Sequence, residues 1–131
     1  KTIILKGVNL FSGLTSEDVF QIAQIVIEER YLAEEVIFRE GDVGDSMFII
    51  IDGSVSVYNQ KKEIATLIKG ECFGEMALLD REPRSSSIRT VTDTAVLKID
   101  EESFYELVSG NIEIIQGIVK ILSKRLRQSI A

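Results

Sequence analysis

Two residues of opposite charge, Glu75 and Arg84, stand nine positions apart in the segment of the sequence that is least typical of strands and turns. A guanidinium is permanently charged and donates forked hydrogen bonds, which suits a phosphate group. A carboxylate accepts hydrogen bonds from sugar hydroxyls, as it does in dinucleotide sites. A small ligand that carries both a phosphate and a sugar hydroxyl would satisfy both side chains.

The residues around this pair predict a short cradle for an anion. A strand is predicted to end at Phe73, Gly74 permits an unusual turn, and residues 75–79 favour one helical turn. The first N–H groups of a helix lack partners inside it and point where an anion can sit. Pro83 stops the turn and fixes φ just before Arg84. We therefore expect backbone N–H groups and Arg84 to converge on one anion.

The apolar pattern along the chain predicts helices, then short strands, then helices again. A Thr15 cap with Asp18 at its N3 position predicts a helix from about Ser16, with Val26 on its apolar face. From about residue 31 to residue 99, β-rich runs alternate with Gly and Asp/Asn signals. The predicted strands are Glu35–Arg39, Met47–Ile51, Ser54–Tyr58, Glu63–Ile68, Glu71–Phe73, Ser86–Thr90 and Ala95–Ile99. Strands of this spacing favour a sandwich, roll or barrel.

The sequence also predicts a tight turn and two further helices. Asp52–Gly53 is typical of a two-residue type I′ hairpin. Asp100 is predicted to cap a helix that ends at Gly110, and a second helix runs over about 111–128. Its apolar stripe comprises Ile112, Ile115, Val119, Leu122 and Leu126. Either the same chain or a partner, including a second copy, is expected to cover this stripe.

Composition excludes several classes of function. The chain has 131 residues, the size of one domain, and no His, which excludes imidazole metal sites and Ser/His/Asp or Cys/His catalysis. Because no other nucleophile and base pair replaces them, we expect no enzyme activity. The net charge of −6 argues against broad binding to nucleic acid or to an anionic membrane. Any anionic ligand must therefore be bound by local groups.

No membrane span, disulfide or leader is expected. The densest apolar run, Met47–Ile51, is far shorter than the roughly 20 residues that cross a bilayer. The single Cys suits a reducing compartment. The chain starts at Lys1 without an initiator Met or a signal-peptide pattern. We expect a cytoplasmic fragment of a larger protein, which can itself be attached to a membrane.

Two separated motifs resemble those of cyclic nucleotide-binding domains. FGEMAL at 73–78, followed by PRSSSI at 83–88, looks like the phosphate-binding cassette of that family. FREGDVGD at 38–45, with the apolar run and Gly53 after it, resembles the first half of the family pattern. The resemblance covers nearly the whole chain and implies one domain over 1–131: an eight-stranded antiparallel β-roll with flanking helices. The implied parts are N-terminal helices at 1–30, the roll at 31–99 with its cassette at 73–88, and two C-terminal helices at 100–131.

The resemblance also implies a role for each cassette residue. Glu75 would bind the ribose 2′-hydroxyl, helped by the Gly74 backbone, and Arg84 would pair with the cyclic phosphate. The N–H groups of Ala77 and Ser85 would add hydrogen bonds. The implied ligand-binding residues are Phe73, Gly74, Glu75, Met76, Ala77, Arg84, Ser85 and Ser86. The ligand would be cAMP or cGMP, with no metal and no other cofactor.

The choice between the two ligands depends on Ser85. The residue after the Arg is often Ala in cAMP-binding members and Thr in cGMP-selective ones, whereas Ser resembles catabolite-activator-like regulators that take cAMP. This resemblance favours cAMP. Because a Ser hydroxyl can bond either the phosphate or a guanine amino group, cGMP stays open. The base is usually capped from the last helix, where Arg125 and Leu126 are candidates.

The resemblance implies a regulatory sensor. The cyclic nucleotide would bind the roll, the flanking helices would shift, and a covalently linked or separate output domain would respond. The alternative is the same fold without a ligand, used as an interaction or dimerisation module, with a homodimer through the C-terminal helix. Neither nucleic acid nor membrane is an expected partner within this chain.

Overall fold

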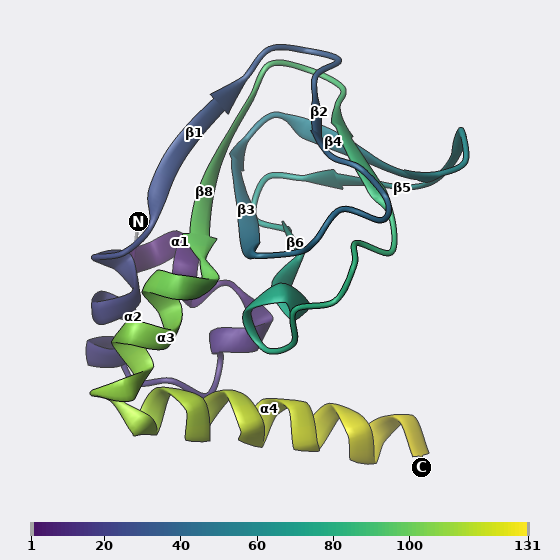
Figure 1. Cartoon of the computed structure of the whole chain (residues 1–131). Helices are drawn as coiled ribbons and strands as arrows, with labels where there is room; N and C mark the ends of the chain where they lie inside the picture. Colours follow the sequence, from purple (N-terminus) through teal and green to yellow (C-terminus); the bar gives the residue numbers. More distant parts are fainter. Residues whose placement is uncertain (1, 131) are drawn as a thin grey trace. The chain divides into compact units, whose positions relative to one another are not determined.

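The computed structural model describes residues 2–130, and side chains are described from Ile4 to Ser129. The chain divides into two compact units (Figure 1). One unit joins the two ends of the chain, up to Ile25 and from Glu102, and is helical. The other, Val26–Glu101, holds the strands and the cassette.

Among the described residues, the unit Val26–Glu101 contains eight antiparallel strands in two four-stranded sheets (Figure 1). The strands are β1 (Ile27–Tyr31), β2 (Val36–Phe38), β3 (Ser46–Asp52), β4 (Ser54–Asn59), β5 (Lys62–Ile68), β6 (Cys72–Phe73), β7 (Ser87–Thr90) and β8 (Thr94–Asp100). One sheet has the order β1-β8-β3-β6 and the other β2-β7-β4-β5. The predicted antiparallel β-roll is confirmed.

Side chains from both sheets form one apolar core. Its buried members are Phe48, Ile50, Val55, Phe73, Ile88 and Val96. The Phe48 and Phe73 rings stack with centroids 5.1 Å apart, and the Phe38 ring lies 5.9 Å from that of Phe73. Each buried Phe contributes about 1.5–3 kcal/mol relative to exposure. The core therefore holds Phe38 and Phe73 firmly, and both residues also border the cassette.

The first strand begins earlier than the sequence predicts. The helix from Ser16 is α2 (Ser16–Ala23), so Val26 is not part of it, and β1 starts at Ile27. The sequence of β1, IEERY, lacks apolar alternation and leaves most of its side chains exposed. Its pairing with β8 supplies the strand structure that its side-chain pattern does not indicate. The roll therefore begins at Ile27, a few residues before residue 31, where the predicted N-terminal helices (1–30) end and the predicted roll (31–99) starts.

The predicted hairpin at Asp52–Gly53 is wrong. β3 and β4 belong to different sheets, so this segment is a corner at which the chain changes sheet. Gly53 has a φ of 92°, and a Cβ there would collide with the Asp93 carbonyl oxygen. The two-residue hairpin is instead at Gln60 and Lys61, between β4 and β5. Their φ values of 49° and 72° suit a type I′ turn, which neither residue type indicates in a sequence.

The helical unit is held by its caps and by apolar packing. Its helices are α1 (Thr2–Lys6), the 3₁₀ turn η1 (Asn9–Phe11), α2, α3 (Glu101–Ser109, whose first residue belongs to the β unit) and α4 (Ile112–Ile130). The predicted Thr15 cap is confirmed: the Asp18 N–H donates to Thr15 Oγ1 at 3.1 Å, and the Asp18 carboxylate accepts from the Thr15 N–H. None of the helices within 2–130 combines the length and the apolar character that a membrane span requires.

Helix α4 is apolar on two sides. Ile114 and Ile118 are fully buried. Ile112, Val119 and Leu126, which belong to the predicted stripe, are 68%, 56% and 63% exposed. These three are spaced seven residues apart, the period of a coiled-coil seam.

Candidate functional site

The two sequence motifs meet in the β unit through backbone contacts. The loop between β2 and β3 runs beside residues 82–84 of the cassette. The contacts are an isolated bridge between Val43 and Pro83, Gly41 N–H to Arg84 O (2.8 Å), Arg84 N–H to Asp42 O (2.7 Å), and Gly44 N–H to Glu82 O (3.2 Å). The first motif therefore fixes the backbone from which the Arg84 side chain projects.

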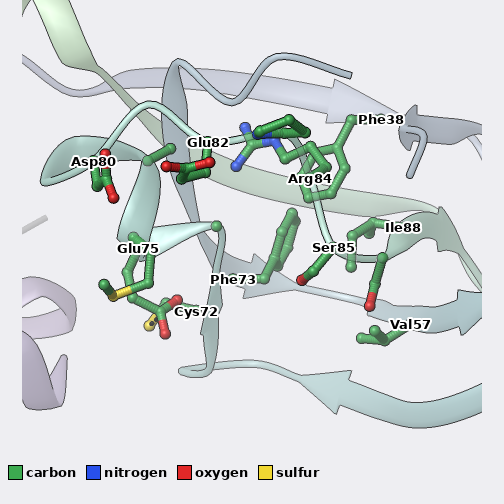
Figure 2. A pocket seen from close by; sticks show the side chains of 15 residues that line it. Phe38, Val57, Cys72, Phe73, Glu75, Asp80, Glu82, Arg84, Ser85 and Ile88 are labelled. Carbon is green, nitrogen blue, oxygen red and sulfur yellow. Dashed lines mark hydrogen bonds between the residues drawn. The ribbon is translucent and has the colours of Figure 1, made fainter. Parts of the chain in front are cut away.

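A cavity of about 330 Å³ lies beside this junction (Figure 2). All eight residues that the sequence assigned to the ligand line it: Phe73, Gly74, Glu75, Met76, Ala77, Arg84, Ser85 and Ser86. In Figure 2, Arg84 and Phe38 lie on one side of the cavity, and Cys72 and Glu75 lie together on another. The structure thus brings the predicted residues together, while their role in binding stays a prediction.

Arg84 is the most buried charged group of the cavity. Only 9% of it is exposed, its guanidinium carbon lies 4.0 Å above the centre of the Phe38 ring, and Nη2 donates to the Ser46 carbonyl at 2.8 Å. Its Nε is buried and has no hydrogen-bond partner among the described residues. Burial lowers the pKa of Arg84, while Asp45 and Asp42 act in the opposite direction. A desolvated cation with a spare donor favours an anion in the cavity.

Gly74 makes room for this guanidinium. Its φ of 74° lies in the left-handed region, as the predicted unusual turn requires. A Cβ at this position would lie 2.6 Å from Arg84 Nη1 and 3.1 Å from the Ser46 carbonyl oxygen. Any larger residue would therefore displace Arg84 or the turn.

The helical turn after Gly74 is the 3₁₀ turn η2 (Glu75–Leu78). Ala77 is buried, and its N–H donates to the Gly74 carbonyl at 3.1 Å. The N–H that the resemblance assigns to the phosphate is thus used inside the turn in this structure. A ligand must share it or displace the Gly74 carbonyl.

Glu75 lies half-buried on another side of the cavity, near Cys72. Cys72 Sγ is 4.0 Å from Glu75 Oε2. The sequence did not predict that Cys72 faces the cavity. Strand alternation carries the signal: Phe73 points into the core, so its neighbour in β6 points away from it. The cavity is also lined by residues that the sequence did not assign to the ligand: Phe38, Val57, Asp80, Glu82, Pro83 and Ile88.

Arg81 ties the loop after η2 to the end of the roll. Its Nη2 lies 2.9 Å from Glu101 Oε1, and its Nε donates to Glu101 Oε2 at 3.4 Å. The Glu101 side chain is 11% exposed, and the Glu101 N–H donates to the Asp45 carbonyl at 2.8 Å. The first residue of α3 is therefore held by both the cassette and the β2–β3 loop.

Comparison with known proteins shows that this arrangement is shared by a protein family. The sequence profile of the family described as "Cyclic nucleotide-binding domain" matches residues 28–111, which include the cassette and the loop that holds it. The chain belongs to this family. Its members are regulatory domains that generally carry out no catalysis themselves.

Relatives within the family share the sequence over nearly the whole chain. The "Cyclic AMP receptor protein" of Thermus thermophilus is 32% identical over 130 residues, which are 95% of this chain and 60% of that protein. The "cGMP-dependent protein kinase" of Plasmodium berghei is 33% identical over 125 residues, again 95% of this chain and 14% of that protein. The chain therefore spans a part of the length of each of these relatives.

A solved structure matches the fold. The N-terminal domain of a transcriptional regulator from Streptomyces coelicolor superimposes with a TM-score of 0.90. The match covers 96% of this chain and 92% of that one at 21% identity. The cyclic nucleotide-binding β-roll is thus the fold of this chain.

Proposed function

We propose that this chain is a regulatory sensor domain that binds a cyclic nucleotide, cAMP in preference to cGMP, and relays binding through its helices to an output domain. The observation that carries the proposal is Arg84, a buried cation whose Nε is unpartnered among the described residues and which borders a cavity inside the family's cassette. Since a chain with one Cys needs no oxidising compartment, we assign the function to the cytoplasm.

The proposed pose follows from the chemistry of the cavity walls. The cyclic phosphate carries one negative charge and pairs with Arg84, where low solvent exposure strengthens the attraction. The Glu75 carboxylate accepts a hydrogen bond from the ribose 2′-hydroxyl. The Gly74 backbone and the N–H groups of Ala77 and Ser85 add further hydrogen bonds to the ligand. Two groups of opposite charge thus hold two chemically different parts of one ligand.

Preference for cAMP is assigned to Ser85. Its side chain is exposed and borders the cavity beside Arg84. A hydroxyl there would bond the phosphate in both ligands. The preference for cAMP rests on the likeness of Ser at this position to catabolite-activator-like regulators, whereas a bond to a guanine amino group would favour cGMP. The names of the relatives include both nucleotides, so the ratio of affinities must be measured.

The route of the relay begins at Arg81. A ligand that reorders the loop after η2 changes the contact between Arg81 and Glu101, and Glu101 is the first residue of α3. The ligand must favour one arrangement of the helices energetically, and coupling energies of this kind are typically about 1–3 kcal/mol. The output domain is covalently linked to the chain or is a separate subunit.

Isothermal titration with cAMP and with cGMP tests the proposal. We expect micromolar dissociation constants, on the order of −8 kcal/mol. Replacing Arg84 by Ala should weaken binding by roughly 2–5 kcal/mol, because the cyclic phosphate then lacks its charged partner. Arg89→Ala, which removes an exposed guanidinium from β7, is the matched control and should leave affinity unchanged. Binding of neither nucleotide at millimolar concentration would contradict the sensor function.

The alternative function, an interaction module, is favoured by one observation on α4. The exposed Ile112, Val119 and Leu126 form a seven-residue repeat that suits a second copy of the same helix. Light scattering would then give twice the mass of the chain, and Val119→Glu would return it to a monomer. This homodimer is compatible with nucleotide binding, so the titration decides whether it is the main function.

A further inference from the structure

Asn59 ends β4 directly behind the cassette. The last pair between β4 and β7 joins Tyr58 and Ser87, so the next residues along the two strands are Asn59 and Ser86. In Figure 2, Ser85 lies on the side of the cavity that carries Val57 and Ile88, which come from these two strands. Asn59 does not line the cavity, although its backbone continues the strand that does.

The Asn59 side chain contacts the cassette at the point where the pairing between β4 and β7 ends. Its amide group faces three acceptors, so the nitrogen must point toward them. In this orientation Nδ2 lies 3.0 Å from the Tyr58 carbonyl oxygen, 3.0 Å from the Ser85 carbonyl oxygen and 3.1 Å from Ser86 Oγ. The amide nitrogen carries two hydrogens for these three acceptors, and a half-buried amide that donates them to the Ser85 carbonyl and to Ser86 Oγ connects both residues to β4.

The contact with Asn59 limits the hydrogen bonds that the Ser86 hydroxyl can make. Because Ser86 Oγ accepts a hydrogen bond from Asn59, its own hydrogen is directed to another partner. Ser86 lines the same cavity as Arg84. The hydroxyl hydrogen is thus free to be donated to a group inside the cavity.

The turn after Asn59 has an unusual backbone conformation. Gln60 and Lys61 both have positive φ, which is unfavourable for residues with a Cβ, and the ladder from β4 to β5 shifts register between Val57 and Tyr58. The surrounding pairing maintains this conformation.

We propose that Asn59 is a positioning residue for the ligand: it fixes Ser85 and orients the Ser86 hydroxyl as an additional donor to the phosphate. The proposal rests on the proposed function and deepens it. It adds to the site a residue that does not touch the ligand and that contacts the cassette across the end of a strand ladder.

Titration of cAMP into four variants tests the role. Asn59→Asp keeps the shape of the side chain and removes its donors, and should weaken binding about tenfold. Ser86→Ala should weaken it about fivefold. In the double variant the two losses should not multiply, because the Asn59 amide acts partly through the Ser86 hydroxyl. Gln60→Gly relaxes the same turn without touching the amide, and should stay within twofold of the wild type.

Several outcomes would overturn the role of Asn59. They are an unchanged affinity in Asn59→Asp, equal losses in Asn59→Asp and Gln60→Gly, or losses that multiply in the double variant.

A second measurement separates this proposal from the proposed function. In nuclear magnetic resonance spectra of the protein without nucleotide, Ser86→Ala should move the side-chain amide resonance of Asn59, whereas Ser109→Ala should not. If the resonance moves and no nucleotide binds, the contact is real and the sensor function is wrong. If the wild type binds cAMP and the resonance does not move, the positioning role is wrong.

Discussion

The Arg84 wall of the cavity and the wall formed by Glu75 and Met76 are built in different ways. Arg84 is 9% exposed, stacks on a core phenylalanine and projects from a backbone that pairs with the β2–β3 loop. Met76 is 56% exposed, and Glu75 stands at the start of a single 3₁₀ turn. Arg84 is thus held by the core and by long-range pairing, whereas Glu75 and Met76 are the outer residues of a 3₁₀ turn whose Ala77 and Leu78 are buried.

This difference between the two walls predicts which residues contribute most to the affinity for a ligand. A preformed donor such as Arg84 loses little conformational freedom when an anion binds, so most of its interaction energy appears as affinity. An exposed side chain such as Met76 has more conformational freedom to lose when a ligand binds, so less of its interaction energy appears as affinity. Replacements on the Arg84 wall should therefore cost more than replacements opposite or beside it.

Among replacements that keep Arg84 itself, Gly74→Ala should have the largest effect. The added methyl group would lie 2.6 Å from Arg84 Nη1, and we expect a loss of about 3 kcal/mol in cAMP binding by titration, within the range for disrupting a buried charged partner. Gly70→Ala is the matched control. Gly70 also has a positive φ, of 91°, but beyond its chain neighbours nothing lies within 4 Å of the place that a methyl group would take. Gly70→Ala should lose about 1 kcal/mol of stability in urea unfolding, Gly74→Ala should lose more because its methyl group meets Arg84 and the Ser46 carbonyl, and only Gly74→Ala should bind the ligand more weakly. Equal affinities in the two variants would contradict a preformed Arg84 wall.

Glu75→Gln should have an intermediate effect. A hydrogen bond to a charged group contributes about 1.5–3 kcal/mol, and Gln retains a weaker acceptor, so a loss of roughly tenfold is expected for cAMP. The 2′-deoxy analogue lacks the hydroxyl and should bind the variant and the wild type equally. Glu82→Gln, in another residue that lines the cavity, serves as the control. The assignment of Glu75 to the ribose fails if the analogue shows the same tenfold loss.

Ser85→Ala should have the smallest effect on affinity and a clear effect on selectivity. Removing one exposed hydroxyl should change cAMP binding by about 0.5–1 kcal/mol, the net worth of a neutral hydrogen bond. The ratio of cAMP to cGMP affinity should change about threefold in competition titrations, with Ser109→Ala as an exposed control. Equal losses for the two nucleotides would remove Ser85 as the residue that discriminates between them.

The cassette was predictable from the sequence because its signals are local. Gly74 has the positive φ that its turn needs, Pro83 precedes Arg84, and all the assigned residues line one cavity. Features that depend on pairing between distant residues were missed. β1 becomes a strand through β8, and the contact of Asn59 with Ser85 exists only because β4 lies beside β7.

The turns show the same limit. Asp52–Gly53 carries the residue types of a hairpin, yet its strands belong to different sheets. Gln60 and Lys61 carry no hairpin signal and form the hairpin. Residue propensities indicate which turn conformations a segment can adopt. Pairing with strands that are distant in the sequence determines which of these conformations forms.

In the proposed complex, the Nε of Arg84, which has no partner among the described residues, would link ligand binding to the lifetime of the folded chain. A buried donor without an acceptor lowers the stability of the fold, and an anion that supplies the acceptor raises it. At a hundred times its dissociation constant, a ligand that binds only the folded state adds about 2.7 kcal/mol to the free energy of unfolding. The concentration of the nucleotide would then set how long the domain survives proteolysis in the cell, in addition to which state it signals.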